Sequence, residues 1–117
     1  GDRILQVIGK KLQQWMRVED TVYRYGGEEF LAVLPGISLE AINERAKSIC
    51  RQIAELQFAV TPEVTINVTV SIGIALYPLH GDDIQQVLKC ADQALYSAKC
   101  ADRNTVFVWN VTKDALA

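Results

Sequence analysis

The sequence contains no apolar run long enough to cross a bilayer and no stretch typical of a secretory signal. It also lacks an excess of basic charge, since 12 Lys and Arg residues stand against 14 Asp and Glu residues, interspersed along the chain. A nucleic-acid surface needs a basic stripe, so we expect no nucleic-acid partner, whereas a small nucleotide ligand fits this charge. These absences predict a cytoplasmic domain.

Cysteine and histidine are scarce. The three cysteines, Cys50, Cys90 and Cys100, fall in segments that read as helical and do not have the spacing of metal ligands. We interpret them as buried or half-buried free thiols in a reducing compartment, rather than as a zinc site or a disulfide. The single histidine, His80, stands alone in a loop and receives no functional role.

The chain has no repeat, low-complexity tract or linker, and half of its 117 residues are hydrophobic, which predicts one domain with its own core. It opens directly into an amphipathic segment. A native domain rarely begins so abruptly, and we expect a chain that is cropped at its N-terminus. The predicted helix has one apolar face, made by Ile4, Leu5, Ile8, Leu12, Trp15 and Met16.

Residues 21–35 read "TVYRYGGEEFLAVLP" and predict a β-hairpin. The first half is rich in strand-forming residues. The run Phe30–Leu34 is apolar at every position, which suits a central strand covered on both faces. Gly26 and Gly27, between the two strands, supply the tight turn.

The next segments predict a helix and a long strand. Ser38 caps the helix, and Thr61–Glu63 forms a turn. Every second residue of Val64–Leu76 is apolar, which predicts one extended strand. The helix stripe consists of Leu39, Ile42, Ala46, Ile49, Ile53 and Leu56, and small residues on the second face of the strand, Ser71, Gly73 and Ala75, would let another element approach closely.

A loop then leads to a helix capped by Asp82 or Asp83, and residues 105–109 predict a final strand. The order helix, hairpin, helix, strand, helix, strand indicates an α/β sandwich with a mainly antiparallel sheet. This is close to a ferredoxin-like arrangement whose first strand is missing from the chain. The core stripe of the last helix consists of Ile84, Val87, Leu88, Ala91, Leu95 and Ala98.

The hairpin tip is the first candidate site. Gly26 and Gly27 would let a phosphate approach the backbone N–H groups. Glu28 and Glu29 point to opposite faces of an extended chain, so one of them would face a ligand. A carboxylate beside a phosphate suits a divalent cation between the two, and the ordinary alternative is a turn followed by two solvated acids.

Two further pairs have functional and ordinary interpretations. Lys99 and Arg103 are four residues apart, so both could reach a polyphosphate from one side of a helix end, or they could simply complement the helix dipole. Arg17 and Asp20 are three apart just before the hairpin, where a local ion pair is the ordinary explanation.

Together these signals match a family. The stretches "RYGGEEF", "SIGIALYP", "ADQALYSAK" and "RN", in this order and at these distances, resemble the GGDEF domain, the catalytic domain of bacterial diguanylate cyclases. The resemblance covers residues 1 to about 109, so residues 1–117 are interpreted as a partial GGDEF domain. It implies condensation of two GTP molecules to cyclic di-GMP with release of two pyrophosphates, dependence on Mg²⁺ or Mn²⁺, and two domains meeting face to face as a catalytic homodimer.

The resemblance assigns roles to the hairpin tip. Gly26 and Gly27 make room for the phosphates. Glu28 is the metal ligand and helps to deprotonate the 3′-hydroxyl, and Glu29 is a supporting carboxylate.

It also assigns roles outside the tip. Lys99 and Arg103 match the positions that hold the terminal phosphates, and Asp2 matches the acid that binds the guanine edge. Arg17 and Asp20 match the family's "RxxD", a product-inhibition site for cyclic di-GMP.

The chain departs from the family at three points. The leading strand with its metal-binding Asp and the next loop with its guanine-binding Asn are absent, and Asp102 stands where the family usually has Gly. Because one of the family's two metal-binding carboxylates is missing, we expect the fragment alone to be inactive or nearly so. For the parent, the resemblance implies an N-terminal sensor domain and allows a membrane anchor and a C-terminal phosphodiesterase domain.

Two alternatives stay open. "ALYPLHGDD" resembles members fused to a phosphodiesterase domain, so a catalytically weak domain that binds GTP or cyclic di-GMP and regulates such a neighbour is the second reading. The intact "GGEEF" favours the enzyme. A purely structural ferredoxin-like domain is the third and would leave four matching motifs as coincidence.

Overall fold

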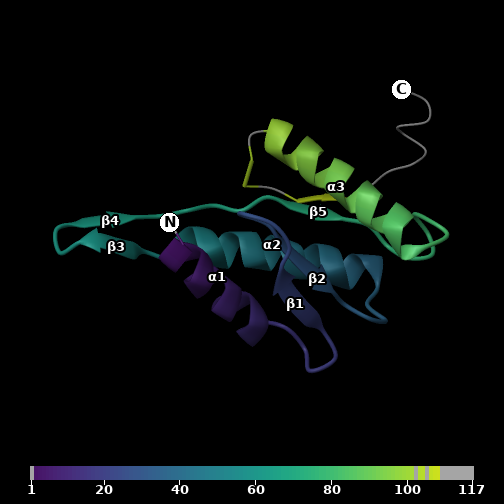
Figure 1. Cartoon of the computed structure of the whole chain (residues 1–117), viewed down its shortest axis with the longest axis horizontal. Coiled ribbons are helices and arrows are strands. Elements are labelled where there is room, and N and C mark those ends of the chain that lie inside the picture. Colours follow the sequence, from purple (N-terminus) through teal and green to yellow (C-terminus); the bar gives the residue numbers. More distant parts are fainter. Residues whose placement is uncertain (1, 102, 105, 109–117) are drawn as a thin grey trace. The chain divides into compact units, whose positions relative to one another are not determined.

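The computed structural model describes residues 2–101, 103–104 and 106–108 (Figure 1). The chain divides into two parts, residues 1–38 and 39–117, and each is treated by itself. The first part contains the helix α1 (Asp2–Gln14) and the strands β1 (Thr21–Arg24) and β2 (Phe30–Val33). The second contains α2 (Leu39–Glu55), β3 (Phe58–Thr61), β4 (Val64–Ile66), β5 (Ile72–Ile74), α3 (Ile84–Cys100) and β6 (Val106–Val108).

In the first part, α1 packs against an antiparallel hairpin, as the sequence predicted. The apolar face of α1 is anchored by Ile8, whose exposed fraction is 4%. The next residue, Gly9, lets the helix come close to the hairpin, because a Cβ added there would lie 3.1 Å from Cε1 of Phe30. The phenylalanine that begins β2 therefore fastens the hairpin to the helix.

The expectation of a central, doubly covered strand at Phe30–Leu34 is wrong for the described structure. Among the described residues β2 pairs with β1 alone, and Val33 at its end is 43% exposed. A fully apolar run indicates a strand that can be buried on both faces, but burial also requires neighbours on both sides. The sequence pattern therefore predicted an apolar strand correctly, but it could not predict how many strands lie beside it.

In the second part, α2 supplies most of the core. Its predicted apolar stripe is largely confirmed, although Leu39 at the start of the helix is 40% exposed. The thiol of Cys50 donates to the carbonyl of Val70, with Sγ and O 3.5 Å apart, and so links the helix to the chain just before β5. The buried residues of α2 are Ala46, Ile49, Cys50 and Ile53.

The small-residue face predicted around Gly73 is confirmed. A Cβ added to Gly73 would lie 2.3 Å from the carbonyl oxygen of Ala91 and 2.3 Å from the backbone nitrogen of Leu95, so the backbone of α3 rests directly on β5. Strand neighbours point to the opposite face, and α2 contacts β5 as well. The two helices thus cover opposite sides of β5 (Figure 1).

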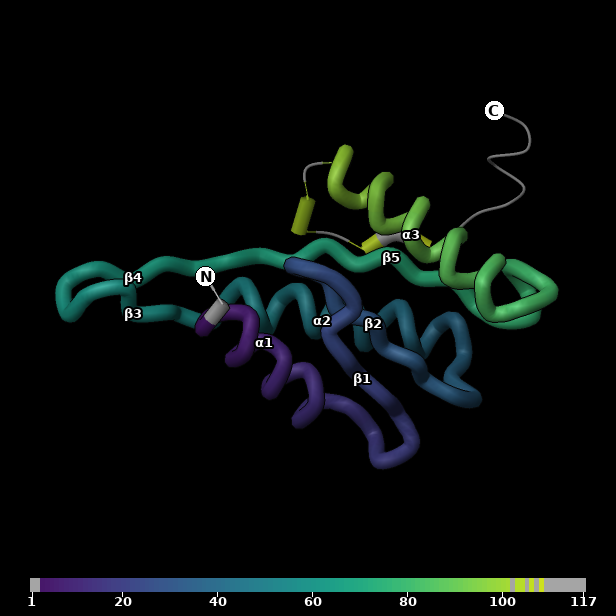
Figure 2. The backbone as a smooth tube through the Cα atoms, in the orientation of Figure 1, coloured from purple at the N-terminus to yellow at the C-terminus, as the bar shows by residue number. Residues whose placement is uncertain are grey.

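The single strand predicted for Val64–Leu76 is wrong. The chain does run as one extended trace (Figure 2), but it is divided into β4, which pairs antiparallel with β3, and β5, which pairs parallel with β6. Between them the side chain of Asn67 donates to the carbonyls of Ala54, at 3.1 Å, and Leu56, at 2.8 Å, and thereby closes the end of α2. Alternation of apolar residues cannot show where a strand changes its partner. The sequence interpretation also missed β3.

The α3 helix begins as expected. Asp83 is its N-cap, with extended backbone, and its Oδ1 accepts from the N–H of Gln86 at 2.9 Å. The side-chain oxygen of Gln86 in turn accepts from the N–H of Asp82 at 2.8 Å, a reciprocal arrangement like a capping box. Ile84 was predicted to belong to the core stripe but is 69% exposed, because it lies at the first turn of the helix.

The loop before α3 is closed by His80, for which the sequence suggested no role. Nδ1 of His80 accepts from the N–H of Leu76 at 2.9 Å, and the backbone N–H of His80 donates to the carbonyl of Leu76 at 2.8 Å. The thiol of Cys90 donates to the carbonyl of His80 at 3.3 Å. Burial lowers the pKa of His80, which keeps the ring neutral and able to accept.

The three cysteines are free thiols, as predicted. Cys50 is buried, which raises the pKa of its thiol, and Cys90 is half-buried. Cys100 is exposed, contrary to expectation, because α3 ends at this residue. Within the described part of the chain, no helix has both the length and the apolar character needed to span a membrane.

Candidate functional site

The hairpin tip, defined as residues 25–29, connects Arg24 to its cross-strand partner Phe30. The loop is closed by its own backbone. The carbonyl of Glu29 accepts from the N–H of Tyr25 at 2.8 Å and from that of Gly26 at 3.3 Å. Glu28 is exposed at this tip, while Glu29 is half-buried.

The two glycines of the tip are not required by the turn itself, which corrects the expectation that the turn needs them. A Cβ added to Gly26 or Gly27 would meet nothing within 4 Å, and neither residue has a left-handed φ. Neither packing nor backbone conformation therefore demands glycine here. A demand for glycine would have to come from something that approaches this backbone from outside the chain.

The donor set at the tip fits a metal that is held jointly with a ligand. The described residues contain no group of three or more Asp, Glu, His or Cys side chains placed to hold a metal ion. Mg²⁺ does not need such a group, because it keeps several waters and uses one or two carboxylates together with substrate phosphates. The exposed carboxylate of Glu28 beside two open glycines can supply one of these ligands.

Arg24 also reaches the tip, a contact that the sequence interpretation missed. Its Nε donates to the carbonyl of Gly27 at 3.1 Å, and its Nη2 donates to the same oxygen at 2.6 Å. Arg24 was visible in the quoted motif, but a strand-end arginine carries no local signal that its side chain turns back to the loop.

Next to the hairpin, a cavity of about 470 Å³ is lined by residues of α1 and of both strands. Its walls combine apolar side chains with basic and amide groups. The lining residues are Leu5, Gln6, Gly9, Lys10, Gln13, Val22, Tyr23, Arg24 and Phe30. Asp2 is the first residue of α1, and its side chain lies outside the described part.

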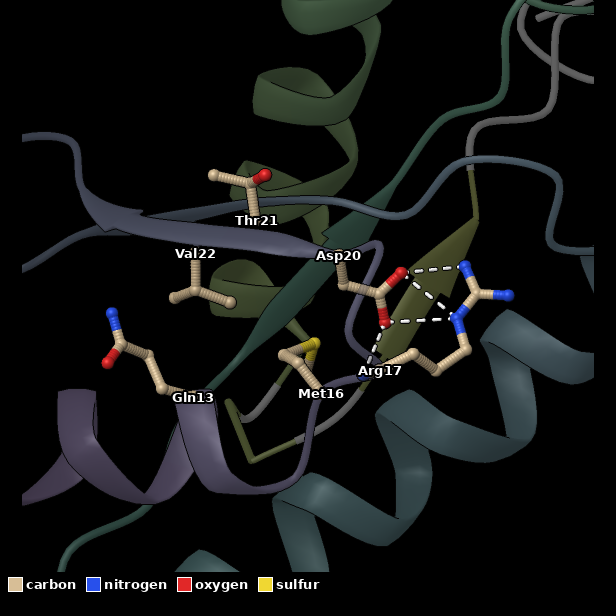
Figure 3. A pocket seen from close by; sticks show the side chains of 6 residues that line it. All are labelled: Gln13, Met16, Arg17, Asp20, Thr21 and Val22. Carbon is tan, nitrogen blue, oxygen red and sulfur yellow. Dashed lines mark hydrogen bonds and ion pairs between the residues drawn. The ribbon is translucent and has the colours of Figure 1, made fainter.

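Arg17 and Asp20 form the local ion pair that was the ordinary interpretation of their spacing (Figure 3). Nε and Nη2 of Arg17 both donate to Oδ1 of Asp20, at 3.0 and 2.6 Å, and the backbone N–H of Arg17 donates to Oδ2 at 2.8 Å. Nη2 also donates to the carbonyl of Pro35 at 2.8 Å. The hydrogen bond to Asp20 raises the pKa of Arg17, whose guanidinium is a cation in any case.

Exposure differs within this pair. The side chain of Arg17 is 28% exposed and that of Asp20 is 0% exposed. Both residues line a second cavity, of about 250 Å³, with Gln13, Met16, Thr21 and Val22. Of the two charged groups, only the guanidinium is accessible to solvent.

Lys99 and Arg103 belong to the other part of the chain and do not share one helix face. Lys99 lies in the last turn of α3, whereas Arg103 follows the helix end with a left-handed φ of 59°. The N–H of Arg103 donates to the carbonyl of Ala98 at 3.1 Å and so helps to close the helix. The i, i+4 argument fails because α3 ends at Cys100. Asp102 lies outside the described residues.

Over residues 1–105 the chain matches the family described as "Diguanylate cyclase, GGDEF domain". It is 36% identical over 108 residues to diguanylate cyclase VdcA of Vibrio cholerae. This alignment covers 91% of this chain and 32% of VdcA. It is 35% identical over 107 residues to the response regulator PleD of Caulobacter vibrioides, in an alignment that covers 91% of this chain and 24% of PleD.

Solved structures agree with these relatives. The GGDEF domain of PA1120 (YfiN or TpbB) from Pseudomonas aeruginosa matches with a TM-score of 0.86 and 30% identity, over 94% of this chain and 68% of that one. The chain spans less than a third of the length of VdcA and PleD, at 32% and 24%. The sequence and the fold place the chain in the diguanylate cyclase GGDEF family.

Proposed function

We propose that this chain is the catalytic GGDEF domain of a diguanylate cyclase, which condenses two GTP molecules to cyclic di-GMP and releases two pyrophosphates. The observation that carries the proposal is the hairpin tip. Gly26 and Gly27 are required neither by packing nor by backbone conformation, and an exposed carboxylate, Glu28, follows them at once. Those features suit a triphosphate that lies against the backbone with a cation beside it.

In this proposal the tip residues have separate tasks. Gly26 and Gly27 leave room for the phosphates, and Glu28 supplies a ligand to Mg²⁺ or Mn²⁺ and helps to take the proton of the 3′-hydroxyl. Glu29 supports the tip, since its carbonyl closes the loop. The cation, when bound, neutralises negative charge on the phosphates as the phosphorus becomes five-coordinate.

The family resemblance assigns nucleotide contacts to three residues outside the tip. Lys99 and Arg103 hold the terminal phosphates, and Asp2 accepts from the N–H groups of the guanine edge. The end of α3 suits a phosphate because two cations, Lys99 and Arg103, lie four residues apart in the sequence there. Because each domain holds one GTP, the reaction needs a second GGDEF domain whose nucleotide presents its α-phosphate in line with the 3′-hydroxyl.

The test uses the full-length protein that contains this chain. It is incubated with GTP and Mg²⁺, and cyclic di-GMP and pyrophosphate are measured by chromatography. Glu28→Ala should abolish product, whereas Glu63→Ala, which removes an exposed carboxylate in the turn between β3 and β4, should leave it unchanged. Product from Glu28→Ala at the wild-type rate would refute the assignment. Binding of GTP or cyclic di-GMP without product would instead favour the regulatory reading.

We further propose that Arg17 and Asp20 form an inhibitory site for cyclic di-GMP. The guanidinium is oriented by Asp20 and Pro35, and its Nη1 lies 3.4 Å from Oε2 of Glu19. The side chain stays 28% exposed, so its outer edge can meet a guanine edge or a phosphate. Asp20 is fully covered in this arrangement, and its main task is to orient Arg17. Asp20 can accept from guanine only if the ion pair opens.

The inhibitory site is tested by titrating the cyclase with cyclic di-GMP. Arg17→Lys keeps the positive charge but loses the planar fork, so the concentration for half inhibition should rise about tenfold or more. Arg51→Lys, an exposed arginine of α2, is the matched control. Unchanged inhibition of the Arg17→Lys variant would exclude this pair as the inhibitory site.

A further inference from the structure

Arg24 is the side chain that turns from β1 into the hairpin tip. Its Nε and Nη2 both donate to one acceptor, the carbonyl oxygen of Gly27, at 3.1 and 2.6 Å. Because the guanidinium is rigid and planar, two hydrogen bonds from it to the same oxygen determine both the distance and the direction of that carbonyl. The contact is specific to arginine, because the ammonium of lysine is a point charge without a fork.

Holding this carbonyl also determines where the next N–H points. The carbonyl of Gly27 and the N–H of Glu28 belong to the same planar trans peptide unit, so they point in opposite directions. The guanidinium on the carbonyl side therefore turns the N–H of Glu28 away from Arg24. It also offsets the partial negative charge of that carbonyl, which would otherwise repel an anion near the tip.

The tip needs such a constraint. Gly26 and Gly27 have no side chains, and a Cβ at either position would meet nothing within 4 Å, so packing does not hold them. Glycine loses more conformational freedom than any other residue when it is fixed. The backbone bonds to Glu29 close the loop at Tyr25 and Gly26, and Arg24 acts on the peptide that follows.

We propose that Arg24 is a positioning residue for the proposed cyclase reaction. It fixes the Gly27–Glu28 peptide, and thereby the N–H and the carboxylate of Glu28, in the orientation that receives the nucleotide and its cation. The inference rests on the proposed function of the tip. Arg24 itself acts through Glu28 and takes no part in the bond that forms between the two nucleotides.

The first experiment needs no catalysis. Hydrogen exchange of the full-length protein, followed by mass spectrometry on peptides covering residues 25–29, reports the opening of the tip directly. Loss of the two charge-assisted bonds in Arg24→Ala should speed exchange there about tenfold, with Arg24→Lys in between. Arg51→Ala, from the exposed face of α2, should leave exchange at the tip unchanged. Wild-type exchange in the Arg24→Ala variant would overturn the proposal.

The second experiment separates positioning from direct binding. In Arg24→Ala, kcat should fall about 100-fold, as expected when a reacting group is misplaced by about 1 Å, while KM for GTP changes little. Arg24→Lys should recover part of kcat. A rise in KM with unchanged kcat and an unchanged tip would mean that Arg24 binds the nucleotide directly, which overturns the proposal.

These outcomes also separate this inference from the proposed function. A wild-type protein that makes no cyclic di-GMP would refute the cyclase, while the exchange measurement would still show whether Arg24 holds the tip. Faster exchange together with a wild-type kcat would show that the contact is merely structural, and the positioning role would then be wrong.

Discussion

Two glycine sites in this chain serve opposite purposes. At Gly73 of β5 the fold leaves no room at all, since an added Cβ would lie 2.3 Å from backbone atoms of α3. At Gly26 and Gly27 of the hairpin tip an added Cβ would meet nothing within 4 Å. Position 73 requires glycine because the backbone of α3 occupies the space of a side chain. Positions 26 and 27 are not crowded by any atom of the chain, so a requirement for glycine there would have to come from a bound ligand.

A similar contrast separates two loops, the loop before α3 and the hairpin tip. The loop before α3 is closed by contacts among its own residues, with His80 bonded to Leu76 in both directions. The tip is closed by the carbonyl of Glu29 and by the side chain of Arg24, and it leaves the carboxylate of Glu28 exposed. The loop before α3 uses its polar groups for its own closure, whereas the hairpin tip leaves a carboxylate exposed to solvent.

The largest effect is expected at the packed glycine. Gly73→Ala places a methyl group against the carbonyl of Ala91 and the backbone of Leu95, which can move only if α3 leaves β5. Overpacking against backbone should lower the free energy of unfolding by about 3 kcal/mol or more. Urea unfolding measures this loss. If the Gly73→Ala variant unfolded at the same urea concentration as the wild type, the close contact between β5 and α3 would be relaxed in solution, and Gly73 would not be a crowded glycine.

The open glycines should respond in the opposite way. Gly27→Ala meets no atom of the chain and needs no left-handed backbone, so the free energy of unfolding should stay the same or rise by about 0.4–1 kcal/mol. Cyclase activity should fall about 100-fold, which is about 2.7 kcal/mol, because the methyl occupies the place proposed for the phosphates. Unfolding and product formation are measured on the same preparation. Full activity would contradict the proposed site.

Gly9 stands between these two extremes. In Gly9→Ala the added Cβ lies 3.1 Å from the ring of Phe30, and the ring must give way by a few tenths of an ångström. Helix propensity favours alanine by about 1 kcal/mol, and the tight contact opposes it by about 1–3 kcal/mol. We expect a net loss of about 1 kcal/mol in urea unfolding. In a Phe30→Leu background the same change should become stabilising, and a loss of equal size there would show that Phe30 is not the obstacle.

The smallest effect is a pH dependence at the closed loop. Burial lowers the pKa of His80 in the folded state below its unfolded value near 6.5, so the unfolded state binds the proton more readily. The contribution of His80 to stability is therefore complete above about pH 6.5 and is lost as the pH falls through the lowered value.

The check compares the wild type with His80→Asn, whose amide oxygen can still accept from the N–H of Leu76 and does not titrate. The difference in unfolding free energy between the two proteins should change between pH 7.5 and pH 5, while cyclase activity at pH 7.5 stays equal. A pH-independent difference would mean that His80 keeps its ordinary pKa.

Several elements could be predicted from the sequence because neighbouring residues determine them. The periodic apolar positions of α1, α2 and α3 gave three helices, and the Asp83 cap follows from an acid placed just before the last of them. The hairpin between Thr21 and Val33 also followed from local composition. The close approach at Gly73 was predicted from a face of small side chains.

Other features failed because they depend on a partner. The alternation of Val64–Leu76 is real, but β4 pairs with β3 and β5 pairs with β6, and the sequence pattern names neither partner. Arg103 was expected on the same side of the helix end as Lys99, whereas the chain turns into a left-handed conformation there. Spacing alone cannot show where a helix stops when no proline marks its end.

The sequence by itself determined which residues stand at the tip, where the helices run and which family the chain resembles, since these follow from residue type and spacing. Only the tertiary structure decided that Arg24 holds the Gly27 carbonyl, that the Asp20 side chain is fully buried in its ion pair with Arg17, and that an added Cβ at either tip glycine would meet no atom of the chain. The physical reason is the range of the interactions. Periodicity and capping act over a turn of helix or less, whereas the direction of a long side chain and the space around a glycine depend on how the folded chain places every neighbour.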